Sequence, residues 1–374
     1  MTTPAPRPVS ARNLGIDLLR VISVAAVVIG HAWVGMPGAD YLQIWRMPLF
    51  FFLAGFFFST SRTLRGELQA RTRSLAVPYA VWLLLLSAGV LAMTQTPWPF
   101  EPGTIRGALI GGARTDMPFL AFWFISVLFF AALLLRAVLA LPWWAGAAVG
   151  LAGLTLAQLP DSAMAYTPLG VGLVPACMAF MLAGHWFGRF MRSPRGLSLP
   201  GKPWIGLLCL GIGFGALAAG AGTMNIKWSG FGTFLLSPVV SVMISIGLVL
   251  LFSTTVNALL GGPRPAEAGP DGAATHRSTE SPARRGRVLG VVISELVQTA
   301  TFVVFAHAMV LYLLLRLFEL ENPVLRTVIA LIICWGLGIL VNRTPLSGPL
   351  NGLPRSALRR RRADHTGGKI ASKT

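Results

Sequence analysis

Ten apolar segments run through the chain, separated by clusters of charged and turn-forming residues. Most are close to the roughly 20 residues that an α-helix needs to cross the hydrocarbon core of a bilayer. Their apolar residues form continuous runs and do not alternate with polar ones, which excludes a transmembrane β-barrel. The pattern therefore predicts an all-α, polytopic membrane protein with about ten transmembrane helices. The predicted spans fall near residues 14–34, 42–59, 75–94, 119–136, 143–158, 169–188, 204–222, 233–256, 288–317 and 324–342.

Composition and charge support a membrane protein and indicate its orientation. Hydrophobic residues make up 54% of the 374 residues, and charged residues only 12%, about half the share in soluble domains. Most of the 31 basic residues fall in the terminal segments and in loops on the same side as the termini, while the opposite loops hold only Arg106, Arg114 and Lys227. The positive-inside rule therefore predicts that both termini are cytoplasmic. The net charge of +18 then reflects topology and contact with anionic lipid headgroups, and no nucleic-acid partner is expected.

The chain divides into a membrane domain and three polar segments. We predict a cytoplasmic N-terminal tail over residues 1–13, the membrane domain over 14–343 and a basic cytoplasmic tail over 344–374. Within the membrane domain, residues 261–287 are rich in Gly, Pro, Ser, Thr and Ala and lack apolar periodicity, which predicts a disordered cytoplasmic loop. The three cysteines all lie in apolar segments with no metal-ligand or disulfide spacing, so neither a metal site nor a disulfide framework is expected.

The first apolar segment contains three ionisable residues, Asp17, Arg20 and His31. Eleven helical steps of 100° place Arg20 and His31 on one face, about 16 Å apart along the axis. Asp17 lies one turn from Arg20 and can pair with it. Ionisable side chains inside a membrane usually face a cavity and mark function. The structural alternative is that Arg20 snorkels or pairs with Asp17, and that His31 hydrogen-bonds to a neighbouring helix.

Other polar residues lie in or beside later segments. His307, inside the ninth segment, either forms an interhelical hydrogen bond or takes part in catalysis. Arg46, at the outer end of the second segment, either holds an anionic group or anchors the helix. His185, near the inner end of the sixth segment, fits a structural or lipid-headgroup role. Arg316 and Arg326 flank an outer loop with two glutamates, so ion pairs are expected there.

The arrangement of Asp17, Arg20 and His31 in a first helix that starts in the cytoplasm resembles acyltransferase family three, the multispanning membrane O-acyltransferases. The second segment, MPLFFFLAGFFFS, is similar to the MPLFFFLSGF stretch of that family. Three weaker similarities follow in the same order, in RTRSLAVPYAVW, FWFISVLFF and TFVVFAHAMV. The resemblance covers about residues 12 to 342, which is nearly all of the predicted membrane domain.

The resemblance implies a multi-pass cell-membrane enzyme that modifies carbohydrate. It implies transfer of an acyl group, most often acetyl, from cytoplasmic acyl-CoA to a hydroxyl of a cell-surface glycan or lipid-linked sugar. Acyl-CoA is then a co-substrate, the glycan is the acceptor, and no bound cofactor is implied. His31 is the candidate general base, because a neutral imidazole is available near physiological pH. Arg20 would bind coenzyme A or the thioester oxyanion, and Asp17 would orient Arg20. A two-step route through acylated His31 or His307 stays open.

Four cytoplasmic arginines are candidates for binding the nucleotide phosphates of coenzyme A, although solvated loop charges explain them equally well. Arg62 and Arg65 have the family's spacing of an arginine, two residues and a second arginine, whereas Arg71 and Arg73, further along, do not. Close members of the family often have a histidine where this chain has Arg46.

Two other functions are consistent with the pattern. A transporter or flippase for a lipid-linked sugar or small solute would use Arg20, His31 and Glu295 to bind substrate or relay protons. The chain lacks the similar halves that many carriers show. The other alternative is a noncatalytic membrane partner or sensor, for which no motif argues.

Overall fold

The computed structural model describes residues 12–262 and 284–353, and within these ranges the chain is helical, with no β-strand. The short helices are α5 (Thr104–Ile110), α9 (Pro194–Leu197), α12 (Asn257–Leu259) and α16 (Ser347–Asn351). The longer helices are α1 (Leu14–Ala32), α2 (Ala39–Phe56), α3 (Leu64–Arg71), α4 (Val77–Ala92), α6 (Phe122–Val138), α7 (Trp143–Ala157), α8 (Val174–Met191), α10 (Lys202–Ala218), α11 (Leu236–Leu251), α13 (Arg284–Gln298), α14 (Ala300–Arg316) and α15 (Pro323–Asn342).

Each of the ten apolar segments contains a helix, and several of these helices are long and apolar enough to cross a membrane. Within the described ranges there are five such stretches, or six if α13 and α14 form one bent span. The count of about ten spans and the cytoplasmic position of both termini stay predictions. The five stretches are Leu14–Ala32, Leu64–Gln95, Pro168–Met191, Leu236–Leu259 and Pro323–Asn342.

The ninth predicted span is broken where we expected one continuous helix. Helices α13 and α14 meet at Thr299 with a bend of 63°. The hydroxyl of Thr299 donates to the carbonyl oxygens of Glu295 (3.0 Å) and Leu296 (3.2 Å) in the preceding turn. Such bonds from a threonine back to the helix often accompany bending, so a local hydrogen bond that hydropathy does not report accounts for the break.

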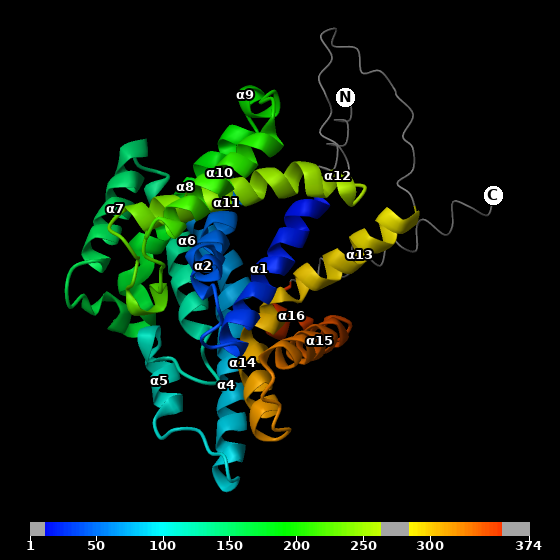
Figure 1. Ribbon diagram of the computed structural model, residues 1–374. Coiled ribbons are helices and arrows are strands. Elements are labelled where there is room, and N and C mark those ends of the chain that lie inside the picture. The colour runs from blue at the N-terminus through cyan, green and yellow to red at the C-terminus, as the bar shows by residue number, and fades with distance from the viewer. Residues whose placement is uncertain (1–11, 263–283, 354–374) are drawn as a thin grey trace, which may run out of the picture.

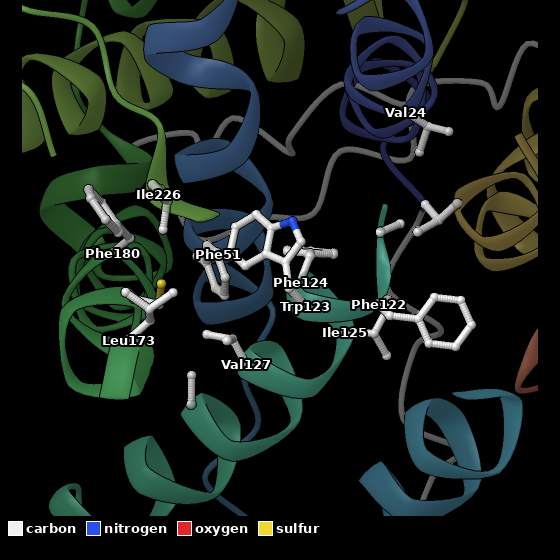
Figure 2. Close-up of a cluster of buried hydrophobic side chains, with 14 of the residues drawn as sticks. Val24, Phe51, Phe122, Trp123, Phe124, Ile125, Val127, Leu173, Phe180 and Ile226 are labelled. Carbon is white, nitrogen blue, oxygen red and sulfur yellow. The ribbon is translucent and has the colours of Figure 1, made fainter. Parts of the chain in front are cut away.

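Helix α1 lies in the middle of the bundle, with α2 on one side and α13, α14 and α15 on the other (Figure 1). Helix α2 in turn packs closely on α8. A Cβ at Gly184 of α8 would lie 2.8 Å from the carbonyl carbon of Phe52, so only glycine permits this approach. Small residues commonly allow such contacts between membrane helices. The buried cluster beside α2 and α8 is rich in aromatic side chains, including Phe51 of α2 and Trp123 and Phe124 of α6 (Figure 2).

The first residues of α1 are fixed to the end of α11. Asn13 caps the helix by accepting a hydrogen bond from the Ile16 amide (3.0 Å), and its own amide donates to the Ser253 carbonyl (2.9 Å). That carbonyl lies in the π-helix η7 (Phe252–Val256), which directly follows α11. The side-chain oxygen of Asn257 accepts from the Leu14 amide (2.9 Å). These bonds fix the position of α1, which carries Arg20 and His31.

Parts of the predicted polar segments lie outside the described residues. These are residues 1–11, most of the 261–287 loop and the tail beyond residue 353. At the edges of these segments, residues 284–287 begin α13, and α16 lies within the stretch assigned to the C-terminal tail. The Leu350 carbonyl of α16 accepts a hydrogen bond from Trp82 Nε1 of α4 (3.1 Å). The packed part of the chain therefore extends beyond residue 343.

Candidate active site

A pocket of about 270 Å³ lies at the end of α1 that we predict to face outward. It is enclosed by α1, α2, the start of α6, the short helix η6 (Ile226–Trp228) and α14. Trp123 and Phe124, labelled within the aromatic cluster of Figure 2, form part of its apolar wall. The polar side chains of its lining belong to His31, Gln43, Arg46, Asn225 and Lys227.

The two candidate histidines lie against each other, although 276 positions separate them (307 − 31). The ring centroids of His31 and His307 are 5.3 Å apart, with the planes tilted by 33°. His307 is fully buried, and its Nδ1 lies 3.0 Å from the carbonyl oxygen of Val303. A carbonyl only accepts, so Nδ1 carries the proton and Nε2 holds a lone pair. Nε2 is buried and has no hydrogen-bond partner among the described residues. His31 therefore faces the pocket, with an unused basic nitrogen of His307 near it.

Arg46 of α2 lies beside the residue that precedes His31. A Cβ added to Gly30 would overlap Nη1 of Arg46 and would lie 2.6 Å from its Cζ. The Nε of Arg46 is buried and has no hydrogen-bond partner in the described part of the chain. The sequence is compatible with two roles for Arg46, an anion site or a helix anchor. Its place in the pocket lining favours the anion site, because the pocket gives an anion access to the guanidinium.

A tight turn between α10 and α11 brings a further part of the lining into place. Asn225 and Gly230 exchange two backbone hydrogen bonds of 2.7 and 3.0 Å, which close the turn. Ser229 adopts a left-handed backbone conformation with φ of 62°. Its hydroxyl donates to the Ala157 carbonyl at the end of α7 (2.8 Å). The turn is thereby fixed against α7, and it presents Lys227 to the pocket.

Lys227 was interpreted from the sequence only as one of three basic residues in the outer loops. In the structure its ammonium donates a hydrogen bond to the Thr115 carbonyl and lies 4.9 Å from the ring centroid of Trp228. Burial lowers the pKa of Lys227, and the nearby carboxylate of Asp116 partly offsets that shift. No motif surrounds Lys227 in the sequence. The one available signal was that it is a rare basic residue on the side of the membrane that the charge distribution leaves poor in cations.

Arg326 fixes the end of α1, which corrects the expectation of ion pairs in the outer loop. Its guanidinium donates to the carbonyl of Ala32, directly after His31. Arg316 instead lies over the ring of Tyr312, 5.9 Å from the centroid. None of the ion pairs between described residues joins either arginine to a loop glutamate. The last carbonyls of a helix lack intrahelical donors and carry partial negative charge, so the end of α1 is a favourable partner for Arg326.

Arg20 lies on the face of α1 that His31 occupies, but outside the pocket. Its Nη1 is 3.8 Å from Asp17 Oδ1, as the spacing predicts, and its Cζ is 5.0 Å from the ring centroid of Phe57. Arg12 forms a second ion pair with Asp17 that sequence analysis missed. The pocket extends inward as far as Val27. Three residues before it, Val24 is buried in the core and lies between Arg20 and the pocket along the axis of α1.

The four candidate donor-binding arginines fall into two pairs. Arg71 Nε contacts Glu67 Oε1 at 2.6 Å, and Arg62 Nη1 contacts Oε2 at 3.2 Å. Glu67 is fully buried, so both arginines neutralise an internal carboxylate. Arg65 and Arg73 are exposed and form no ion pair with a described residue.

His185 lies apart from the pocket, in α8. It is buried, and its ring meets that of Phe58 edge to face with centroids 6.2 Å apart. Both ring nitrogens lack a hydrogen-bond partner within the described part of the chain. This packing is consistent with the structural role that we favoured.

Comparison with known proteins bears on the chemistry of this pocket. The family described as an acyltransferase domain, acyltransferase family 3, matches residues 13–343. Comparison with curated proteins gave no match, and neither did comparison with solved structures. The matched range includes every residue of the pocket. The chain therefore belongs to acyltransferase family 3.

Proposed function

We propose that this membrane acyltransferase moves an acyl group, acetyl in the first instance, from cytoplasmic acyl-CoA to a hydroxyl of a cell-surface glycan or lipid-linked sugar. The observation that carries the proposal is the His31 imidazole, which lines a polar pocket beside the free Nε2 of His307. A hydroxyl is a weak nucleophile, and a positioned base that removes its proton accelerates attack by roughly 10²- to 10⁴-fold.

His31 acts as the general base in this mechanism. It takes the proton of the acceptor hydroxyl while the oxygen attacks the thioester carbonyl, so that a C–O bond forms and an oxyanion develops. The C–S bond then breaks, the ester remains on the acceptor, and the protonated imidazole returns its proton to the departing thiolate. His307 is a positioning residue: its Nδ1 donates to Val303, and its Nε2 lone pair is available to a proton on His31.

A covalent route uses the same pocket. One histidine would take the acyl group from the thioester and pass it from an acyl-imidazole to the hydroxyl. The full burial of His307 favours His31 as the residue that contacts substrate in either route.

The donor would enter from the cytoplasm, and the acceptor from the outside. This orientation follows from the proposed plasma-membrane location, about ten spans and cytoplasmic termini. Of the candidate arginines, Arg65 and Arg73 form no ion pair with a described residue, and Arg20 shares the charge of Asp17 with Arg12. These three are assigned to the phosphates of coenzyme A, since Arg62 and Arg71 neutralise Glu67. Helix geometry places Arg20 about 16 Å from His31 along α1, and Val24 is buried between them. Delivery of the thioester therefore requires the side chains around Val24 to move apart.

The test is acyl transfer by membranes that contain the protein. Radiolabelled acetyl-CoA and total cell-envelope glycans are supplied, and we expect labelled ester that mild base releases. His31→Ala is expected to lower the rate by about 10²- to 10⁴-fold, and Arg20→Ala to raise the KM for acetyl-CoA. His185→Ala, a histidine outside the pocket, is the matched control and should retain activity. Full activity in His31→Ala would overturn the proposal, and uptake or flipping of a sugar without ester formation would indicate a carrier.

A further inference from the structure

We propose that the acceptor carries a negatively charged group, a carboxylate or a phosphate, which Arg46 and Lys227 hold while His31 activates a neighbouring hydroxyl. This inference rests on the proposed function and names the class of its acceptor. It follows from the charges that line the pocket, and none of the stretches quoted above as similar to the family contains Lys227.

The pocket combines two cations with no acid. Arg46 and Lys227 belong to its lining, and no aspartate or glutamate is among the described residues that line it. Asp116, the carboxylate that acts on Lys227, lies outside the lining. Arg46 and Lys227 are both half-buried, and only the charge of Lys227 is partly offset, by Asp116; a cation that is partly removed from water gains from an opposite charge. The site therefore has an excess of positive charge that an anionic ligand would neutralise.

Both cations retain donors for such a ligand. The Nε of Arg46 is buried with no hydrogen-bond partner among the described residues, and a guanidinium matches the planar geometry of a carboxylate or the oxygens of a phosphate. An ammonium has three donors, of which Lys227 uses one on the Thr115 carbonyl. Arg46 is placed by its contact with Gly30, and Lys227 by the closed turn of η6. The hydrogen-bonded turn therefore places Lys227 before a ligand arrives, which reduces the entropy cost of binding.

The size of the pocket limits the ligand. A volume of about 270 Å³ lies just below the usual range for drug-sized ligands, so the pocket takes about one sugar unit. The charged group and the acylated hydroxyl therefore belong to the same sugar unit or to directly linked units. Gln43 and Asn225 supply neutral donors and acceptors for the remaining hydroxyls.

The first test measures binding by the full chain in lipid nanodiscs, without acyl-CoA. Thermal unfolding is followed with glucuronic acid, glucose 6-phosphate or glucose at constant ionic strength. We expect at least one charged sugar to raise the melting temperature, because a ligand that binds only the folded state stabilises it, and glucose to have no effect. Stabilisation by glucuronic acid would identify the anion as a carboxylate, and stabilisation by glucose 6-phosphate would identify it as a phosphate.

Variants locate the effect. Lys227→Gln and Arg46→Gln should each remove the stabilisation by the charged sugar, and Lys227→Arg should restore it. Arg106→Gln removes one exposed positive charge from helix α5, away from the lining, and should bind as the wild type does. Stabilisation by glucose equal to that by the charged sugars would overturn the proposal. So would stabilisation by none of the three, or an unchanged effect in Lys227→Gln.

The second test separates acceptor binding from stabilisation of the oxyanion. Acetyl transfer is compared between a glucuronic acid oligosaccharide and the same oligosaccharide with its carboxyl groups reduced to alcohols. We expect kcat/KM to be at least about tenfold higher for the charged acceptor, and Lys227→Gln to remove this preference through KM with little change in kcat. Loss of kcat with unchanged KM would assign Lys227 to the oxyanion instead and overturn the proposal.

The two proposals fail differently. Equal transfer to both oligosaccharides would support the acyltransferase function and contradict the requirement for an anionic acceptor. Charge-dependent binding without ester formation on any acceptor would contradict the acyltransferase function and support a site for an anionic ligand.

Discussion

The guanidinium of Arg46 occupies the space next to Gly30 in which any other residue would place its Cβ. Because Gly30 directly precedes His31, this contact brings the cation Arg46 of α2 next to the candidate base His31 of α1. The contact gives Gly30 a role that its position in an apolar helix does not reveal.

Gly30→Ala is expected to displace Arg46 and lower acyl transfer while the protein still folds. The added methyl group would lie 2.6 Å from Cζ of Arg46, at the far end of a flexible side chain that can move away. Displacement of a positioning group by about 1 Å can cost about 10²-fold in rate. The rate of ester formation is the measurement. Gly336→Ala, where a Cβ meets open space, is the matched control, and equal activity of both variants would contradict the prediction.

The two nitrogens of His307 are expected to have separable roles. Asn places an amide nitrogen near the position of Nδ1 and preserves the bond to Val303, whereas Gln places its amide near Nε2. If His307 assists His31 through Nε2, His307→Asn should lose activity and His307→Gln should retain more. Rates and melting temperatures are measured for both variants, so that a structural effect appears as a change in stability. The reverse order of activity would assign His307 to packing.

Val24→Trp is expected to block delivery of the acyl donor. Val24 is buried between Arg20 and the pocket, so a larger side chain there would prevent the separation that a thioester needs. Transfer from acetyl-CoA should fall sharply, while binding of a charged sugar to the outer pocket stays unchanged. Ile22→Trp, at an exposed position of the same helix, is the control. An active Val24→Trp enzyme would place the donor path elsewhere.

Glu67→Gln is expected to destabilise the protein. Glu67 is fully buried and accepts from Arg62 and Arg71, so the neutral amide would leave Arg71, which is only 19% exposed, without its counter-charge. Loss of a charged hydrogen-bond partner costs about 1 to 3 kcal/mol. The melting temperature in detergent is the measurement. Arg65→Gln, which removes an exposed charge from the same helix, should leave the melting temperature unchanged.

Anion binding is expected to weaken at alkaline pH. Burial lowers the pKa of Lys227, and binding requires its charged form. Affinity for a charged sugar should therefore be full below this pKa and fall as the pH rises through it. Lys227→Arg should retain binding to higher pH, because a guanidinium stays protonated. The dissociation constant is measured against pH for both proteins, and loss of binding at the same pH in both would contradict the prediction.

The first helix illustrates how far sequence analysis reached. The spacing of Asp17, Arg20 and His31 predicted a common face and an ion pair, and both are present. Arg12, one position before the cap residue, was missed as a partner of Asp17. It lies in a segment without helical periodicity, and its contact with Ser294 of α13 depends on how distant helices pack.

By itself, the sequence determined the all-helical class, the apolar segments and the face of α1 that carries His31, because these depend on length, hydropathy and a period of 3.6 residues. Only the tertiary structure decided which groups meet that face. His307, Arg46, Lys227 and Arg326 come from three other helices and a turn, at separations along the chain that leave no local pattern. The tertiary structure also decided the bend at Thr299 and the space at Gly30. Each depends on a particular hydrogen bond or contact that average hydropathy does not encode.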